Sequence, residues 1–538
     1  MTRRSMGCSL LAVVWLLAAG PLLSQQTFNR HQVVLDSQGK LLSWVQPQDK
    51  AYDRVMRLGW DFLLNTVPVE PNGLKTFYTY CCIDEKTLRG GDWLHNPAGM
   101  FAMFVDAATS YYPYSGDRRV LDLARGLLDY QRAHGTTPAN WEWGGVPYAS
   151  SDPGATEFRG GHDFLFVRHG TDWGRGDGYG ATEPDKVGEL GMGYLKFYEL
   201  TGETVYRDAA LACANALARH VRPGDDQHSP WPFRVFAEDD TVREEYSANV
   251  IGPVRLLDEL VRLSLGDVPA YRRARQTAWT WLMAYPMKNQ IWHGYFEDIP
   301  TFEKLTNFNQ YSPMETARYI LLHPEYDPNW KADVPALIQW VERTLGPDVP
   351  NEPGMQWGAQ TISEQIDDTH KMGSHTSRYA SVNALWYEKT GDAAAKEKAF
   401  RSFNWATYMC HENGAVNDLA VEDQTVWFSD GYGDYVRHFM AGLGSVPEWA
   451  PPGETHLLRS SSVVRKVRYA ARELSYSTFD EDATEIMRLA FRPARVTANG
   501  KPLGQRADLN EPGWVFDAKT GVLQVRHAAA RDIVVSGP

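Results

Sequence analysis

This sequence of 538 residues lacks several features that mark particular classes of protein. Its five cysteines include no Cys-x-x-Cys pair, which excludes a zinc ribbon. It has no low-complexity tract and no block of like charges, as expected for a globular chain. The formal net charge of −13 argues against a nucleic-acid partner, because phosphates would be repelled. After the first 24 residues, no segment is apolar enough to be a membrane helix.

The composition that is present indicates a folded protein with many aromatic side chains. Hydrophobic residues make up 43% of the chain and charged residues 22%. Aromatic residues reach 12%, and the 19 tryptophans are a high number. Tryptophan is bulky and amphipathic, and it is common where a flat, partly apolar ligand is held.

The N-terminus has the pattern of a secretory signal. Arg3 and Arg4 form a basic start, and the apolar stretch 10–19 is too short to span a bilayer comfortably. Small residues follow, with Ser24 a plausible cleavage position. We therefore expect residues 1–24 to be a signal peptide and the mature protein to be secreted or periplasmic.

One unit recurs along the chain, and it reads as a tight helical hairpin. An apolar and aromatic helix end is followed by Gly-Asp or Gly-Glu and then by a new amphipathic helix, as in "FYELTGETVYRDAA" at 197–210. Glycine accepts the left-handed backbone that ends a helix, and the acidic residue caps the next helix. The four clear copies have their glycines at Gly116, Gly202, Gly266 and Gly391, and a degenerate fifth begins at Leu321.

These hairpins predict twelve helices joined by alternating short turns and long loops. Outer helices are expected at 51–64, 117–133, 204–220, 268–285, 328–345 and 392–410. Inner helices are expected to begin near 96, 183, 249, 313, 376 and 432. Six such pairs favour an all-α (α/α)6 toroid with the long loops on one face, over an open superhelical array.

The chain changes character at about Pro451. Segments such as "KVRYAARELSYSTFD" alternate apolar and polar residues and are separated by Asn-Gly and Thr-Gly turns, which are strand and hairpin signals. We therefore expect a toroid at 25–450 and a small antiparallel, β-sandwich-like domain at 451–538.

The six long loops carry the residues of a sugar site. A closed ring would bring these loops and the inner-helix N-termini around one bowl, where aromatic faces stack on sugar rings and polar groups bind hydroxyls. We expect substrate contacts from Trp93, His95, Trp141, Trp143, Trp173, Asp177, Tyr246, Trp292, Asp368, His370, His375, Arg378 and Trp427.

Carboxylates at the helix starts are the candidates for catalysis. Asp185 and Asp92 lie near the starts of adjacent inner helices and could face each other across the bowl. Glycoside hydrolysis needs an acid and a base or nucleophile, and Glu183 or Glu245 could substitute for either. The alternative for Asp185 is a helix-capping role, which Asp often has.

The turn motif and the segment "DKVGELGMGYL" at 185–195 resemble the six-hairpin glycosidase superfamily. The layout of this segment is similar to an inner helix of the unsaturated glucuronyl and rhamnogalacturonyl hydrolases. In those enzymes an Asp that opens the helix is the general acid/base. The resemblance therefore implies this role for Asp185 and, through "DWLHNPAG" at 92–99, a second role for Asp92.

We expect a secreted glycoside hydrolase that uses no metal and no cofactor, and the oligomeric state stays open. A polysaccharide lyase is the first alternative, with Tyr246, His375 and Asn249 as the residues of interest. A non-catalytic glycan-binding protein and an epimerase are the others. In a closed ring the first and sixth hairpins are neighbours, so a disulfide from Cys410 to Cys81 or Cys82 is geometrically reasonable.

Overall fold

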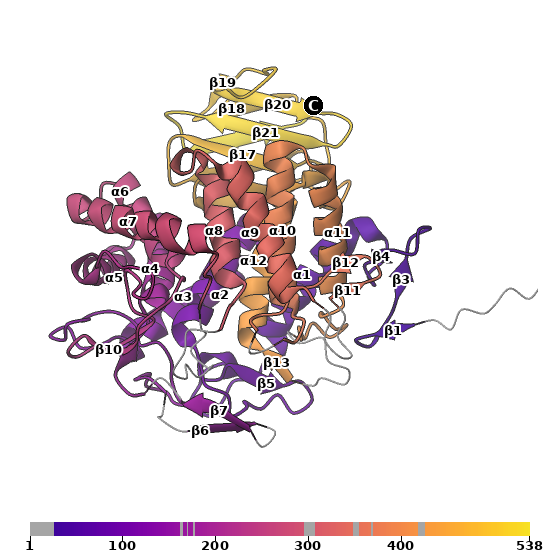
Figure 1. The fold of residues 1–538 in the computed structure, drawn as a ribbon. Helices are drawn as coiled ribbons and strands as arrows, with labels where there is room; N and C mark the ends of the chain where they lie inside the picture. The colour runs from indigo at the N-terminus through magenta and orange to yellow at the C-terminus, as the bar shows by residue number, and fades with distance from the viewer. Residues whose placement is uncertain are drawn as a thin grey trace, which may run out of the picture.

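A computed structural model describes most of the chain, and its outline is shown in Figure 1. The described residues are 26–161, 165–168, 171–175, 178–294, 307–347, 354–366, 369–417 and 426–538. In 165–168, 171–175 and 426–430 the backbone alone is described. The expected signal peptide at 1–24 lies outside these ranges.

Twelve α-helices alternate between outer and inner positions in the described part of the chain. The outer helices are α1 (Ala51–Asp61), α3 (Arg119–His134), α5 (Thr204–His220), α7 (Val268–Leu282), α9 (Trp330–Leu345) and α11 (Ala393–Thr407). The inner helices are α2 (Pro97–Ser115), α4 (Pro184–Thr201), α6 (Ile251–Arg262), α8 (Tyr311–Leu322), α10 (Gly373–Thr390) and α12 (Ser429–Ser445). The helical content and its pairing into hairpins agree with the prediction from sequence.

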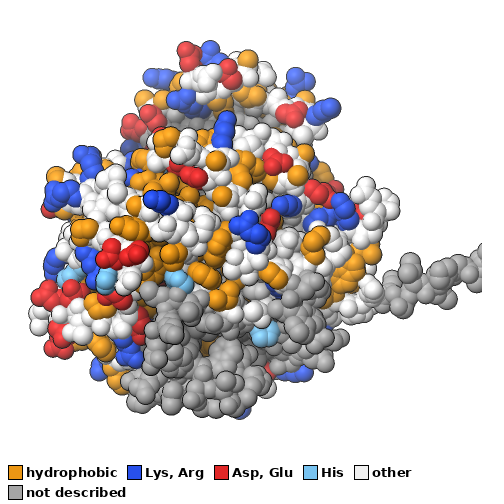
Figure 2. Space-filling model, in the orientation of Figure 1, with side chains coloured by type: hydrophobic (Ala, Val, Ile, Leu, Met, Phe, Trp, Pro, Cys, Tyr) orange, Lys and Arg blue, Asp and Glu red, His pale blue; other side chains and the backbone are white. Residues whose placement is uncertain are grey.

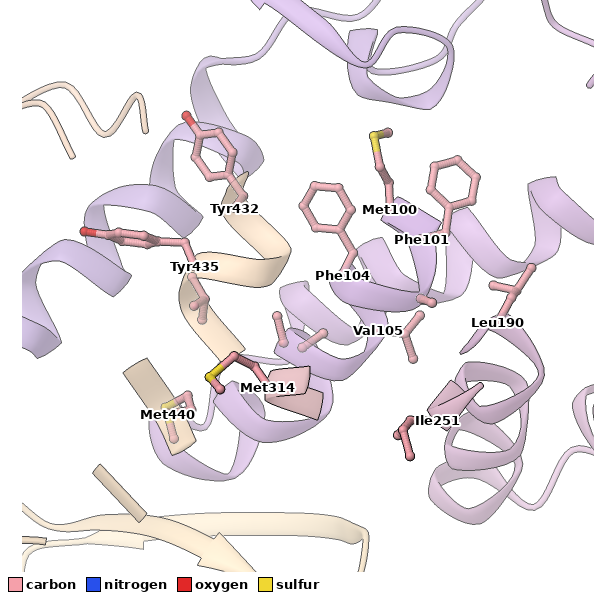
Figure 3. Close-up of a cluster of buried hydrophobic side chains, with 14 of the residues drawn as sticks. Met100, Phe101, Phe104, Val105, Leu190, Ile251, Met314, Tyr432, Tyr435 and Met440 are labelled. Atoms are coloured by element: carbon pink, nitrogen blue, oxygen red, sulfur yellow. The ribbon is translucent and has the colours of Figure 1, made fainter. Parts of the chain in front are cut away.

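The inner helices contact one another in chain order, and α12 also packs against α2. A side chain on Gly433 of α12 would lie 2.8 Å from the backbone of Met103 in α2, so these two helices are in close contact. Apolar side chains fill part of the space between the inner helices, and Figure 3 shows a cluster of them. Phe104, Leu190 and Met314 come from α2, α4 and α8 and are fully buried.

The Gly-acid turns form as the sequence predicted. Gly116, Gly202 and Gly391 end their helices with φ of 72°, 79° and 78°, which only glycine adopts readily. The carboxylate of Asp392 accepts hydrogen bonds from Ala394 N and Ala395 N at the start of α11. Asp267 caps α7 in the same way, whereas Glu203 makes no side-chain cap to α5.

Two glycines allow α4 and α6 to approach closely near their N-termini. A Cβ on Gly188 would lie 2.2 Å from Pro253 N, and one on Gly252 would lie 3.0 Å from Asp185 O. A Cβ on Gly188 would clash with the backbone of Pro253, and one on Gly252 would be in tight contact with α4. The close approach places Asn249, just before α6, beside Asp185.

We therefore expect Gly188→Ala to destabilise the protein by about 3 kcal/mol, although alanine is the better helix former by about 1 kcal/mol. Gly193→Ala is the matched control in the same helix, because its Cβ would meet nothing closer than 3.8 Å. The control is expected to be neutral or slightly stabilising. Urea unfolding of both variants gives the comparison, and equal stabilities would show that α4 and α6 can separate freely.

The C-terminal part forms two antiparallel sheets, in agreement with the predicted strands. One sheet has the order β14-β17-β21-β20 and the other the order β15-β16-β22-β18-β19. The strands are β14 (His456–Ser460), β15 (Val464–Ala470), β16 (Glu473–Thr478), β17 (Ala483–Arg488), β18 (Arg495–Ala498), β19 (Lys501–Leu503), β20 (Gly513–Asp517), β21 (Val522–His527) and β22 (Asp532–Ser536). Leu474, Met487 and Leu523 are fully buried in the core of this unit.

The C-terminal sheets cover the C-terminal ends of several inner helices (Figure 1). The Tyr469 hydroxyl donates to Pro113 O near the end of α2. Arg465 Nε donates to Glu199 O in α4 at 2.6 Å, and Arg459 pairs with Glu388 in α10. These contacts leave the N-terminal ends of the inner helices on the opposite face.

A buried carboxyl pair lies at this junction. Glu199 is 2% exposed, and burial together with the hydrogen-bonded neighbour Glu259 raises its pKa to about 9. The folded state therefore holds this proton at neutral pH, whereas the unfolded state has released it.

We expect Glu199→Gln to stabilise the protein relative to wild type, and the difference to grow as the pH rises from about 5 to about 9. Above pH 9 the difference should stay constant, because Glu199 is then ionised in both states. Thermal melts across this pH range test the expectation. A difference that does not change with pH would show that Glu199 is not protonated in the folded protein.

Short strands and single helical turns lie in the N-terminal segment and in the connections between the helices. β5 (Cys82–Asp84) pairs with β13 (Val426–Phe428) and so joins the first long loop to the last. The other short strands are β1 (Thr27–Phe28), β2 (His31–Gln32), β3 (Val34–Leu35), β4 (Leu41–Leu42), β6 (Leu165–Arg168), β7 (Thr171–Arg175), β8 (Ala181–Thr182), β9 (Arg234–Phe236), β10 (Thr241–Glu244), β11 (Met355–Gln356) and β12 (Ala359–Gln360). The helical turns are η1 (Gln48–Lys50), η2 (Phe62–Thr66), η3 (Thr76–Tyr78), η4 (Met283–Met287), η5 (Pro324–Tyr326) and η6 (Pro447–Trp449).

The disulfide considered for Cys410 is not formed among the described residues. Cys81, Cys82, Cys213 and Cys410 are all buried free thiols. The Cys410 thiol lies against the backbone of α1, with Val55 O at 3.7 Å, whereas Cys82 Sγ packs against Gly91 in the first long loop. Burial raises the pKa of Cys410, so this thiol stays protonated.

The described residues also show the character of the helices and of the surface. Within these residues, no helix combines the length and apolar character needed to cross a bilayer. Basic and acidic side chains are interspersed on the face shown in Figure 2.

Candidate active site

Asp185 lies in the first turn of α4, where it is buried among polar groups. Its Oδ1 accepts from the backbone N–H of Lys186 at 2.8 Å, and its Oδ2 accepts from Asn249 Nδ2 at 2.9 Å. The side chain is 5% exposed, and this burial raises the pKa of the carboxyl to about 6 in spite of the Lys186 ammonium at 3.9 Å. A carboxyl with such a pKa holds or releases a proton near neutral pH, as a general acid/base must.

Hydrogen bonds extend from Asp185 to the start of α8. Asn249 Oδ1 accepts from the Ser312 hydroxyl at 3.1 Å. Asn309 Oδ1 accepts from the backbone N–H of Ser312, also at 3.1 Å. Asn249 is thereby held with its amide N–H₂ directed at Asp185, because its carbonyl already has a donor.

A second polar group surrounds His375 at the start of α10. Arg378 Nη1 lies 2.9 Å from His375 Nδ1, and Glu364 Oε1 lies 3.3 Å from His375 Nε2. Because arginine can only donate, Nδ1 is the acceptor and the ring proton is on Nε2, facing the carboxylate. The Gln310 side chain also reaches Nδ1, at 2.5 Å.

Arg378 is fully buried and joins α8, α10 and α12 through carboxylates. Its Nη2 donates to Asp434 Oδ2 at 2.5 Å, and its Nε lies 3.2 Å from Glu315 Oε1. Its guanidinium also lies over the ring of Tyr311, 4.6 Å from the centroid. The surrounding cations lower the pKa of Glu315 to about 2, and they hold the pKa of Asp434 well below its usual value. Both carboxylates are therefore ionised and serve to hold Arg378.

Further toward the C-terminal sheets, three adjoining cavities of about 190, 370 and 20 Å³ share Asp106 and Arg437 in their lining. Lys196 and Arg437 both pair with Asp106, and Arg318 pairs with Glu315. The interior between the inner helices therefore holds a dense set of ion pairs below the Asp185 and His375 groups.

The other candidate carboxylates lie in different surroundings. Glu183 is fully buried, and its Oε1 accepts from Arg234 Nε at 2.6 Å. Glu245 pairs with Arg222 in a half-exposed position. Asp92 is exposed in the loop before α2. Asp185 differs from these three in its hydrogen bonds to Lys186 N and Asn249 Nδ2, and burial raises its pKa to about 6.

Several aromatic and histidine candidates are placed in the core instead of a bowl. Trp143 is fully buried, stacks on His220 at 4.4 Å and donates to Asp240. His95 and Trp292 are also fully buried, and the His95 ring is hydrogen bonded to Tyr78 O at 2.8 Å. Tyr246, a candidate for the lyase alternative, is buried too. In this conformation, none of these rings offers a face to a ligand.

The remaining substrate-binding candidates are half-buried or lie outside the described residues. Trp93, Trp141 and His370 are half-buried. Asp177, Asp368 and the side chains of Trp173 and Trp427 lie outside the described residues. Sequence reasoning did not include Ser312, Gln310 and Glu315 among the candidates. Their position at the start of α8 is the signal that could have identified them.

Within the described residues, no group of three His, Cys, Asp or Glu side chains is arranged to hold a metal ion. Of the residues described above, Asp185 can transfer a proton. Asn249, His375 and Arg378 can form hydrogen bonds to a polar ligand.

No family model matches the sequence, and no curated protein matches it in sequence. Solved structures are similar in fold. A D-mannose isomerase has a TM-score of 0.52 at 11% identity, over 74% of this chain and 99% of that one. The cellobiose 2-epimerase from Spirochaeta thermophila DSM 6192 has a TM-score of 0.51 at 11% identity, over 75% of this chain and 99% of that one. The cellobiose 2-epimerase from Bacillus thermoamylovorans B4167 has a TM-score of 0.51 at 8% identity, over 73% and 97%.

These structures are (α/α)6 toroids, and at such identities the likeness concerns the fold alone. The resemblance to the six-hairpin glycosidase superfamily that the turn motifs implied is therefore confirmed as a resemblance in fold.

Proposed function

We propose that this protein is a carbohydrate-active enzyme that hydrolyses a glycosidic bond, with Asp185 as the general acid/base. The observation that carries the proposal is the buried Asp185 carboxyl with a pKa of about 6 at the loop-side end of the inner helices. Its two hydrogen-bond donors fix its position, and the fold is one on which sugar-processing enzymes are built.

The chemistry proposed for Asp185 has two steps. In its protonated form it donates the proton to the leaving oxygen of the sugar, and as a carboxylate it then takes a proton from water. Asp92 is our candidate for the second carboxylate. Hydration of an unsaturated sugar, the reaction of the hydrolases that the sequence resembles, needs mainly one such group.

A second candidate is isomerisation or epimerisation of a sugar, in which a proton leaves one carbon and returns. His375 supports it, because imidazole is a common acid/base group near neutral pH and its Nε2 lies 3.3 Å from the Glu364 carboxylate. The three similar structures reported above carry isomerase or epimerase names, which supports the same candidate.

The test is a screen of the purified protein against plant and bacterial glycans in isotopically labelled water. A hydrolase incorporates one ¹⁸O from H₂¹⁸O for each bond that it cleaves. An isomerase or epimerase incorporates deuterium from D₂O into a carbon–hydrogen bond and cleaves nothing. A lyase gives a product that absorbs near-ultraviolet light and contains no added water. Glycan binding without any product would mean a non-catalytic protein.

We also propose that the six hairpins close into a complete (α/α)6 toroid at 25–450, with 451–538 as a separate small domain. The contact of α12 with α2 and the pairing of β5 with β13 support closure. Residues 1–24 are proposed as a cleaved signal, and N-terminal sequencing of the exported protein tests this.

A further inference from the structure

A cavity of about 960 Å³ lies on the loop side of the molecule, apart from the residues around Asp185. It is bordered by the C-terminal end of α3, by the loop that follows it, and by β9 with the turn before β10, at the lower left of Figure 1. Its volume is at the upper end of the range for small-molecule sites, which suits several linked sugar units better than one.

Two aromatic side chains in this cavity, Trp141 and Tyr179, are partly open to solvent, and the third, Tyr148, is buried beside Trp141. Trp141 is half-buried, and Tyr148 packs edge-on against it with the ring centroids 6.3 Å apart. The indole N–H of Trp141 makes no hydrogen bond among the described residues. Tyr179 is 58% exposed, and its hydroxyl donates to Asp152 Oδ2 at 2.8 Å. An exposed ring that is fixed in this way is a surface on which a sugar ring can stack.

The charge of the lining indicates which glycans would fit. The described lining residues include four carboxylates, from Asp152, Glu157, Glu238 and Asp239, and one guanidinium, from Arg159. Glu157 Oε1 also accepts a hydrogen bond from His134 Nδ1 at 2.8 Å. Carboxylates accept hydrogen bonds from sugar hydroxyls, but an excess of them repels the carboxylate of a uronate.

From these observations we propose that this cavity, lined by Trp141, Tyr148 and Tyr179, is a binding site for a neutral oligosaccharide. It would hold sugar units of the substrate beyond the one that reacts. Its residues take no part in the hydrogen bonds around Asp185, although β8 joins Gly180 in its lining to Glu183 at the start of α4. The role in catalysis rests on the proposed function, whereas the binding itself does not.

The test measures binding by affinity electrophoresis and calorimetry, with Asp185→Asn as the background so that nothing is turned over. The probes are glucomannan and xylan oligosaccharides as neutral glycans, polygalacturonate as an acidic glycan and chitosan oligomers as a cationic one. We expect a neutral glycan to bind, polygalacturonate not to bind, and Trp141→Ala to weaken the neutral glycan about tenfold or more.

Two further variants separate loss of the site from loss of the fold. Tyr179→Ala removes an exposed ring and should weaken binding several-fold with no change in the melting temperature. Trp141→Phe keeps an aromatic face and should retain most of the affinity. Trp330→Ala, which removes a half-buried tryptophan at the start of α9, is the matched control and should bind as the background does.

The proposal is overturned if no neutral glycan binds, if polygalacturonate or only chitosan binds, or if Trp141→Ala and Tyr179→Ala bind as well as the background does. Failure of the proposed function is distinguishable from these results. It would appear as glycan binding that depends on Trp141 in a native protein that forms no product.

Discussion

Asp185→Asn is expected to lower kcat/KM on the glycan substrate by about 10³-fold, since positioned acid/base groups contribute between about 10² and 10⁴. Asparagine has nearly the same shape, but its one carbonyl oxygen can accept from only one of the two donors, Lys186 N–H or Asn249 Nδ2, and its N–H₂ group then faces the other. It cannot give up or accept the reacting proton. The effect should therefore fall mainly on kcat, with substrate affinity largely kept.

The matched control is Glu203→Gln, in the turn that follows the C-terminal end of the same helix. Glu203 is a half-exposed carboxylate that pairs with Arg125, far from Asn249 in the fold. We expect its kcat/KM to equal that of wild type within error. Substantial residual activity in Asp185→Asn would assign the acid/base role to another group, with Asp92 and His375 the next to replace.

The same substitution should stabilise the protein at alkaline pH. The folded pKa of Asp185 is raised from 3.8 to about 6, so an ionised Asp185 opposes folding above pH 6. About two pKa units correspond to roughly 3 kcal/mol, which is an upper limit for the gain in Asp185→Asn at pH 8. At pH 4 the two proteins should differ little. Thermal melts at both values would show the change, and equal differences at both would contradict the raised pKa.

Arg378→Met is expected to destabilise the protein by about 3–5 kcal/mol at pH 7, the usual result of removing one partner of a buried ion pair. Asp434 and Glu315 would lose a cation from their buried surroundings. Arg437 stays beside Asp434, so the loss should not exceed this range. Chemical unfolding with urea gives the free energy directly.

The effect of Arg378→Met should depend on pH with a definite sign. The pKa of Glu315 is lowered to about 2 and that of Asp434 lies well below its usual value, so both pairs stabilise the fold above pH 4 and lose this effect as the pH falls. The variant should therefore differ most from wild type at neutral pH and less in acid. Arg468→Met is the control, because its pair with Glu473 is exposed and contributes little. Wild-type stability of Arg378→Met at pH 7 would mean that the buried pairs are not formed.

The helical framework could be predicted because its signals are local. A glycine that needs positive φ and an acidic residue that caps the next helix lie side by side, so Gly391 and Asp392 predict their turn without knowledge of the rest of the fold. The predicted helix limits differ from the observed ones by a few residues, since a hydrophobic pattern does not mark the final turn of a helix.

The site was harder to predict, because burial depends on residues that are distant in sequence. Trp141 and Trp143 are two positions apart in the same loop. One lines a cavity and the other stacks on His220 in the core. Similarly, Glu183 and Asp185 are two positions apart, and of these two carboxylates it is Glu183 that pairs with Arg234. Nothing near residue 183 in the sequence shows which carboxylate receives that cation.

The glycines of α4 show how such a position could be recognised. Gly188 weakens the helix locally, and the structure shows that it admits Pro253 and so brings Asn249 to Asp185. A glycine that weakens a helix near an acidic N-terminus therefore indicates that another element packs closely against that end of the helix.

The most direct test of the central claim is the pH dependence of kcat/KM for the wild-type enzyme, because this ratio reports groups of the free protein. If Asp185 is the proton donor, kcat/KM should fall tenfold per pH unit on the alkaline side of an apparent pKa near 6. A profile that stays level from pH 5 to pH 8, or that falls only below pH 5, would show that a protonated Asp185 does not carry the reaction.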